Sequence, residues 1–242
     1  MIKKLFSLLT LFTVSNAVFA QSTCNTAQVI TAGSYTVDTI NGTGVVVSSL
    51  NQGAIKNTRN INKWTGAITL GSASTIVSGT LSGTTTDSLL VETGGINLAT
   101  YVLTTDVVKG MRIDGVISGT GGLTKISGDT LILGGANSYS GATTLTNGII
   151  QLQNQDGLGS TTAGVTGASN TTVASGTTIK LVGTSFLIPE VLSLSGLGVN
   201  TQGVLVNTGG TNSLIGDITI SSDATIVSNG NNPNDSLIVL GR

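Results

Sequence analysis

Residues 52–78 read QGAIKNTRNINKWTGAITLGSASTIVS, and residues 202–228 read QGVLVNTGGTNSLIGDITISSDATIVS. The two stretches align without a gap and are identical in 13 of 27 columns. After a shift of two residues the match resumes between residues 87–91 and residues 235–239. The chain therefore contains one full unit of about 150 residues and the start of a second, and such long-period self-similarity is typical of proteins built from stacked repeats.

Short segments within the unit alternate apolar and small polar residues and are bounded by Gly, Asn or Ser. This alternation predicts strands with Leu and Ile on one face and Thr or Ser on the other. The inward positions predicted in this way are Ile68, Leu70, Leu131, Leu133, Leu145, Ile150, Leu152, Ile179, Leu181, Leu192, Leu194, Ile218 and Ile220. Such a narrow set of side chains does not close a globular core alone, whereas stacked coils cover each other's apolar faces.

The fold predicted from this pattern is an all-β solenoid of roughly ten coils, each of about 20–25 residues. The chain has only two prolines, which fits, because each internal strand needs its amide hydrogens for the coils on both sides. Its aromatic content of 3% fits as well, since aliphatic side chains fill a narrow interior. A β-sandwich or barrel is the alternative, although its core calls for more aromatic residues.

The composition also excludes several classes of protein. A mean hydropathy of +0.37 with a formal net charge of −1 does not match a disordered chain. The absence of histidine removes the usual general base and the usual metal ligand, and with them most hydrolase mechanisms. No cofactor is expected. The charge balance does not favour nucleic acid as a partner.

The N-terminus has the pattern of an export signal. Lys3 and Lys4 precede an apolar run at residues 5–14, and Ala20 followed by Gln21 forms the predicted cleavage point. The apolar run is shorter than a membrane span, although a short anchor is the alternative. We thus predict a signal peptide at 1–20, a leader or capping segment at 21–51 and the solenoid at 52–242, with no transmembrane segment in the mature chain.

Cys24 is the only cysteine, so it forms no disulfide within the chain. Lipidation is possible in principle for a cysteine just after a signal, but Gln21, Ser22 and Thr23 do not resemble a lipoprotein cleavage box. We expect an inert thiol.

Residues 115–152 resemble the passenger-associated repeat of autotransporter proteins, which are secreted surface proteins of Gram-negative bacteria. The resemblance runs from GVISGTGGLTK at 115–125, through TLILGGANSYSGATT at 130–144, to GIIQL at 148–152. The motif residues are Gly122, Leu123, Lys125, Leu131, Leu133, Gly134, Asn137, Tyr139, Gly141 and Gly148. The resemblance implies a right-handed parallel β-helix that is displayed or released outside the cell.

Two features depart from that family. Ser127 and Asp129 stand where the family commonly has glycine, so we expect a different turn there. An autotransporter also ends in a membrane β-barrel, and no run of barrel strands with aromatic girdles is recognisable. A truncated passenger or another export route would account for this.

Charged residues are densest at Asp106, Lys109, Arg112 and Asp114. Strand alternation places Lys109 away from Arg112 and Asp114, so we expect a solvated stretch with charges near turns rather than a catalytic cluster. Calcium-binding and ice-binding solenoids show tandem Gly/Asp motifs or Thr ladders. The sequence shows neither, because its Thr-rich pieces at 84–86 and 143–144 do not recur at coil spacing.

Aromatic residues offer two other candidate sites. Lys56, Arg59 and Lys63 before Trp64 would suit an aromatic platform in a basic patch, but we expect Trp64 to pack in the interior. Tyr139 is expected to pack at a turn rather than to hold a ligand.

The sequence therefore predicts a non-enzymatic, extracellular structural or adhesive segment with surface glycans or proteins as partners. Two alternatives stay open: a polysaccharide-active β-helix whose catalytic coils lie beyond residue 242, and a rod that associates with itself through its exposed ends.

Overall fold

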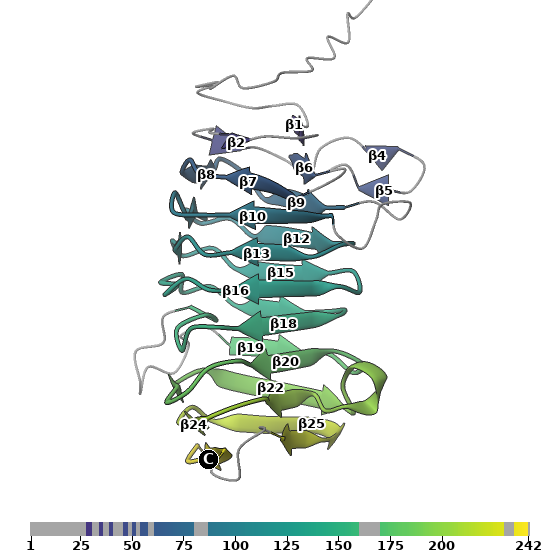
Figure 1. The fold of residues 1–242 in the computed structure, drawn as a ribbon, viewed down its shortest axis with the longest axis vertical. Coiled ribbons are helices and arrows are strands. Elements are labelled where there is room, and N and C mark those ends of the chain that lie inside the picture. The colour runs from purple at the N-terminus through teal and green to yellow at the C-terminus, as the bar shows by residue number, and fades with distance from the viewer. Residues whose placement is uncertain are drawn as a thin grey trace, which may run out of the picture.

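A computed structural model gives the fold of the chain (Figure 1). It describes short strands within residues 28–51 and, side chains included, residues 54–57, 61–79, 87–159, 170–229 and 235–241. Several predictions fall outside these residues: the signal peptide with its cleavage between Ala20 and Gln21, Cys24, Arg59 and the Thr-rich piece at 84–86.

The strands form the sides of a stack of coils, and within each coil they occupy side 1, side 2 and side 3 in turn (Figure 1). Side 1 is a sheet of nine strands, in the order β1 (Gln28–Ile30), β6 (Ile55–Asn57), β9 (Ser74–Ser78), β12 (Leu103–Val107), β15 (Leu123–Ile126), β17 (Thr143–Leu145), β19 (Asn170–Val173), β22 (Val191–Gly196) and β25 (Ile218–Ala224). Side 2 is a second sheet of nine, in the order β2 (Ser34–Tyr35), β7 (Ile61–Trp64), β10 (Ser88–Val91), β13 (Met111–Ile113), β16 (Thr130–Leu133), β18 (Ile149–Leu152), β20 (Thr178–Leu181), β23 (Leu205–Asn207) and β26 (Ile226–Ser228).

Side 3 is less regular. It contains β3 (Thr39–Ile40), β8 (Ile68–Leu70), β11 (Ile96–Asn97) and β14 (Ile117–Ser118) in one sheet, and β21 (Leu187–Ile188), β24 (Thr211–Leu214) and β27 (Ser236–Val239) in another. Between these two sheets, the described residues 134–142 and 153–159 contain no strand. A separate antiparallel pair joins β4 (Val46–Val47) to β5 (Leu50–Asn51), and one short 3₁₀ helix, η1, spans Val199–Thr201.

The pairing confirms the predicted fold class, an all-β parallel solenoid, because every strand pair on the three sides is parallel. The nine strands of each long sheet are slightly fewer than the roughly ten coils expected. The coils vary in length: Leu103, Leu123 and Thr143 follow one another at equal intervals, whereas the interval from Thr143 to its next partner, Thr171, is longer. With about 4.8 Å between strands, the described stack is roughly 40 Å long.

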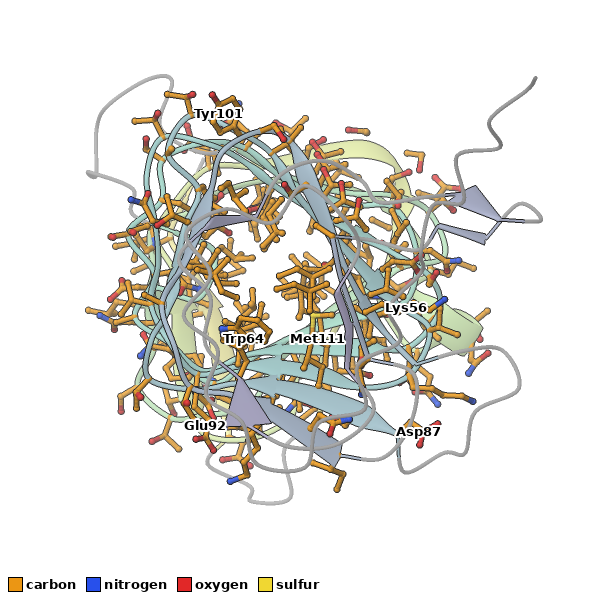
Figure 2. All side chains as sticks on the ribbon, turned by 90° about the horizontal axis from the view of Figure 1, so that it is seen from above. Lys56, Trp64, Asp87, Glu92, Tyr101 and Met111 are labelled. Atoms are coloured by element: carbon orange, nitrogen blue, oxygen red, sulfur yellow. The ribbon has the colours of Figure 1, made fainter. Side chains whose placement is uncertain are left out.

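The interior is a continuous aliphatic core that fills the space between the three sides (Figure 2). Eleven of the predicted inward residues are at most 2% exposed: Ile68, Leu70, Leu131, Leu133, Leu145, Ile150, Leu152, Ile179, Leu181, Leu192 and Leu194. Trp64 and Met111 also point into the core, as Figure 2 shows. Alternation therefore predicts which face of each strand is buried.

Two predicted inward positions differ from the rest. Ile220 is 51% exposed, so its predicted burial is wrong, and Ile218 is only partly buried against the core. Both belong to β25, which ends the order of its sheet among the described strands, so a neighbouring strand covers only one of its flanks. The register between β22 and β25 also shifts beyond Leu194 and Ile220, which breaks the alternation.

The two sequence copies form the same buried asparagine pair. In the first copy the Asn62 amide donates to the Asn57 side-chain oxygen at 2.7 Å, and the Asn57 amide donates to the Ser88 carbonyl at 2.8 Å. In the second copy Asn212 donates to Asn207 at 2.8 Å, and Asn207 donates to the Ser236 carbonyl at 3.0 Å. Because the chain turns sharply between strands there, the side-chain amides bond groups that the strand ladder leaves free.

The second copy nevertheless occupies different sides of the stack, because each of its strands lies one side further on than the matching strand of the first copy. The first copy runs β6, β7, β8, β9 and β10 on sides 1, 2, 3, 1 and 2, whereas the second runs β23, β24, β25, β26 and β27 on sides 2, 3, 1, 2 and 3. The offset between the copies thus equals six coils and one further side. The asparagine pair is a local corner structure that works at either of two corners.

Replacing Leu131 with Ala should lower the free energy of unfolding by about 2–5 kcal/mol, because it leaves a cavity in a fully buried column. Urea unfolding followed by circular dichroism measures the loss.

Ile132→Ala is the matched control, since Ile132 is the next residue on β16 and faces outward, half-buried. It should cost less than half as much. Equal losses for the two variants would contradict the assigned inward face.

Candidate functional site

The predicted repeat-motif residues lie in two neighbouring coils, on β15 to β18 and the turns next to them. Leu123, Leu131 and Leu133 are fully buried. A Cβ on Gly122 would lie 2.6 Å from the Ala142 carbonyl oxygen of the next coil, too close for any side chain. Glycine at 122 therefore lets two coils approach closely, and Gly141 meets the Gly121 carbonyl in the same way. A Cβ on Gly134 would overlap only the Asp114 carboxylate, the end of a side chain that can move.

Lys125 is a fully buried lysine at the corner between sides 1 and 2. Its ammonium donates to the carbonyls of Ser127 at 2.5 Å, Asn147 at 3.0 Å and Ile126 at 3.2 Å. Burial lowers the pKa of Lys125 from 10.5 to about 8, while the negative charges of Asp129 and Asp106 oppose this shift. The ammonium thus binds the backbone of two successive corners, and its three donors are occupied.

Ser127 and Asp129 explain how this corner forms without the glycines expected there. Ser127 takes a left-handed φ of 65°, and its hydroxyl donates to the Asp106 carboxylate at 2.5 Å. Asp129 accepts a hydrogen bond from the Thr130 amide at 2.7 Å. Asp106 is only 8% exposed, so the prediction of a solvated charge is wrong for this residue: it is held beneath the corner by Ser127.

Asn137 replaces strand pairing on side 3. Its side-chain oxygen accepts from the Ile117 amide of the preceding coil at 2.8 Å, and its amide donates to the Gly157 carbonyl of the following coil at 2.7 Å. The residue is 3% exposed. One asparagine therefore connects three coils at a level where side 3 has no strand.

Tyr139 lies inside the solenoid, as predicted for a packing residue. It is fully buried, and its hydroxyl is 2.6 Å from the Thr143 hydroxyl. In the next coil Thr171, the register partner of Thr143, donates to the buried Glu190 carboxylate at 2.7 Å. Burial raises the pKa of Tyr139 above its usual value; the Thr143 hydrogen bond opposes this rise and the Glu190 charge adds to it. No ligand reaches the ring from solvent.

The four charged residues at 106–114 do not converge. Asp106 belongs to β12 on side 1, whereas Arg112 lies on β13 on side 2 and forms an ion pair with Asp114 at 2.7 Å. As predicted, they do not share a strand face. Within the described residues, no group of three or more His, Cys, Asp or Glu side chains is arranged to hold a metal ion.

The candidate aromatic platform is also ruled out by burial. Trp64 is 1% exposed and lies in the core, as expected for a packing residue. Lys56 is 8% exposed, and Lys63 pairs with Glu92 at 2.9 Å. These residues do not form an open basic surface around an aromatic ring.

A column of hydroxyl residues on side 1 has no counterpart in the sequence predictions, which include no threonine repeat at coil spacing. The strand register aligns Thr75, Thr104, Thr124, Thr144, Thr172, Ser193 and Thr219, one from each of seven successive strands. They alternate with inward residues, and their exposure grows from buried Thr75 to exposed Thr172. Thr104, Thr124 and Thr144 recur at equal intervals, so the prediction that the threonines at 143–144 do not recur at coil spacing is wrong for these coils. The longer interval from Thr144 to Thr172 hides the continuation of the column.

Comparison with known proteins gives one family. Residues 123–152 match the model of the passenger-associated-transport-repeat, which confirms the resemblance drawn from the sequence and is consistent with an autotransporter passenger domain. A search of curated proteins and a search of solved structures each return no match. No helix in the described part of the chain is long and apolar enough to cross a membrane.

Replacing Asn137 with Ala should destabilise the fold by at least about 2 kcal/mol, because the Ile117 amide and the Gly157 carbonyl lose their buried partner. Hydrogen exchange of the Ile117 amide should also accelerate. Ser138→Ala, at the exposed neighbouring position, is the control and should change neither quantity. An unchanged exchange rate in the Asn137 variant would argue against the bridge.

The stability of the protein should depend on pH through Lys125. Between about pH 8 and 10.5 the unfolded chain holds a proton on Lys125 that the folded chain has released, so the free energy of unfolding rises with pH in this window. Below pH 8 Lys125 is charged in both the folded and the unfolded chain, so the cost of burying its charge lowers the free energy of unfolding in full there. Urea unfolding of the native protein and of Lys125→Met, from pH 7 to 10, should show a rise that only the native protein has.

Both proteins contain every other ionisable group of the chain, so the difference between their profiles reports Lys125. Parallel stability profiles would show that Lys125 keeps an ordinary pKa.

Proposed function

Because residues 123–152 carry a passenger-associated transport repeat, we propose that this chain is a non-catalytic, rigid β-helical segment of an exported surface protein, with an adhesive role. The observation that carries the proposal is the continuous stack of parallel coils, in which the repeat motif is part of the core. Because the residues of the motif are used in packing, the motif supports the scaffold, and any activity must lie elsewhere on the chain.

The polar residues of the motif support a structural role. Lys125 and Asn137, which could act chemically at an open surface, are buried and bonded to backbone groups of neighbouring coils. The hydroxyl of Tyr139 likewise faces Thr143 inside the stack. These groups hold the coils in register and are not accessible to a substrate.

Adhesion is supported by the outward surfaces. Side 1 presents the hydroxyl column, and the two described surface ion pairs, Lys63 with Glu92 and Arg112 with Asp114, are internally neutralised. Such a surface offers hydrogen bonds without a strong field, which suits partners such as surface glycans or proteins better than nucleic acid. Export is supported by the predicted signal peptide at 1–20 and by the family of the repeat.

The test is surface exposure in a producing bacterial cell. We expect the epitope-tagged full chain to be removed by protease added to intact cells, while a periplasmic marker stays intact. The purified chain should give the X-ray scattering of an elongated particle with constant cross-section, as the stack requires.

Retention of the tagged chain inside protease-treated cells would argue against display. Release of reducing ends from a polysaccharide, lost in Asp106→Ala or Asp114→Ala, would argue against a non-catalytic role.

A further inference from the structure

One corner of the solenoid departs from the regular pattern. Between β15 and β16 the chain turns over residues 127–129, but between β22 and β23 it uses residues 197–204, which include η1. Asn200 and Thr201 there have φ angles of 51° and 61°, in the left-handed region that residues with side chains rarely adopt. Strained conformations of this kind tend to occur at binding sites.

The glycines of this corner are required by close backbone approach. Gly198 has φ 81° and ψ −179°, a conformation that essentially only glycine adopts. A Cβ on it would overlap the Gly203 carbonyl. The backbone is thus folded tightly on itself, and Thr178 of the preceding coil ties it to the stack: its hydroxyl accepts from the Val199 amide at 2.9 Å and donates to the Gly203 carbonyl at 2.8 Å.

The next coil bulges opposite this loop. Leu194 pairs with Ile220, but Gly196 pairs with Ala224, so residues 221–223 of β25 lie opposite the single residue Ser195, and β25 carries two extra residues. Such bulges re-aim side chains and are common next to functional sites. The bulge is held in place by hydroxyl contacts, with Ser193 to Ser221 at 2.8 Å and Ser195 to Ser222 at 2.7 Å.

Loop and bulge enclose a hollow of about 460 Å³ at the surface. Its lining residues are Ser175, Gly176, Gly196, Leu197, Gly198, Ser222 and Asp223. Leu197 is 48% exposed, and a Cβ on Gly176 would point into open space. The volume is in the range of ligand pockets, and, as in most of them, the lining exposes more apolar than polar surface.

The residues that line the hollow indicate which class of ligand it suits. Asp223 is its one charged side chain and no Lys or Arg contributes, so an anion meets repulsion without compensation. Two serine hydroxyls and glycine backbone supply hydrogen bonds, and Leu197 supplies one apolar surface. A saccharide matches this set, since its hydroxyls donate to a carboxylate in charge-assisted bonds and its ring carries an aliphatic face.

We propose that this hollow binds a neutral saccharide, with the Asp223 carboxylate accepting hydrogen bonds from sugar hydroxyls and Leu197 lying against the ring. This inference deepens the proposed adhesive function and rests on it, because it names the class of partner. Few contacts are available, so the affinity of a single site is in the micromolar to millimolar range.

The test uses the purified full chain on an array of neutral oligosaccharides of glucose, galactose, mannose and N-acetylhexosamines, next to acidic oligosaccharides that carry uronic or sialic acid. We expect binding to a subset of the neutral glycans. Asp223→Asn keeps the shape but removes the charge, and should weaken binding about tenfold or more. Gly176→Asn places a side chain at the hollow in a conformation that asparagine tolerates, and should abolish binding.

Matched controls separate the site from general effects. Asp156→Asn removes a carboxylate elsewhere, and Gly209→Asn adds a side chain in open space at another corner. Both should bind like the native protein. Binding to acidic glycans alone, absence of neutral binding, or native affinity in both hollow variants would each overturn the proposal. None of these outcomes affects the scaffold role, which surface protease treatment and scattering test separately.

Discussion

The lateral pairing of parallel coils is the constraint on which this structure depends. A single coil has too few inward side chains to exclude water, so its burial comes from the coils above and below. Inward columns such as Leu103 with Leu123 and Leu131 with Ile150 are continuous only if the strands keep register. A shift of one residue would turn every side chain of a strand to the opposite face. The rest of the sequence must therefore keep the strands in register.

Corners are where this protection is needed, because strand hydrogen bonding stops there and backbone groups lose their partners. The chain meets the need with buried polar side chains: the Asn57 and Asn62 pair, Lys125, and Asn137. Each bonds groups that belong to more than one strand or coil, so each fixes the position of neighbouring coils as well as its own turn. A buried polar group is costly when unpaired, and a corner with a displaced neighbour would leave it so. These residues consequently favour one stacking over others, and two of them, Lys125 and Asn137, belong to the matched repeat at 123–152.

The sequence predicts the strands well because their alternation is a local property, and eleven of the inward positions in the solenoid are buried as expected. It does not predict how strands align between coils, because the interval between aligned residues changes from one coil to the next. The longer interval after Thr144 hides the continuation of the threonine column to Thr172, although the three threonines before it are evenly spaced. The buried Asp106 was missed because its partner Ser127 lies one coil later, and the fate of Ile220 depends on an interrupted register. The irregular corner at 197–204 has no recognisable signal beyond its glycines, since its shape arises from contacts between coils.

The contrast between regular coils and coils with irregular corners bears on which residues are available for function. The motif coil that begins on β15 is short, and its Lys125 and Asn137 side chains are used for stacking. The coil of β22 and β23 is longer than that one, and its surplus residues are free from the ladder, so they form a loop and oppose a bulge. The two sequence copies are also offset by one side of the stack, so their corresponding corners face different directions. A match to the repeat at 123–152 therefore reports how this part of the chain folds, and the saccharide site that we propose lies in coils outside it.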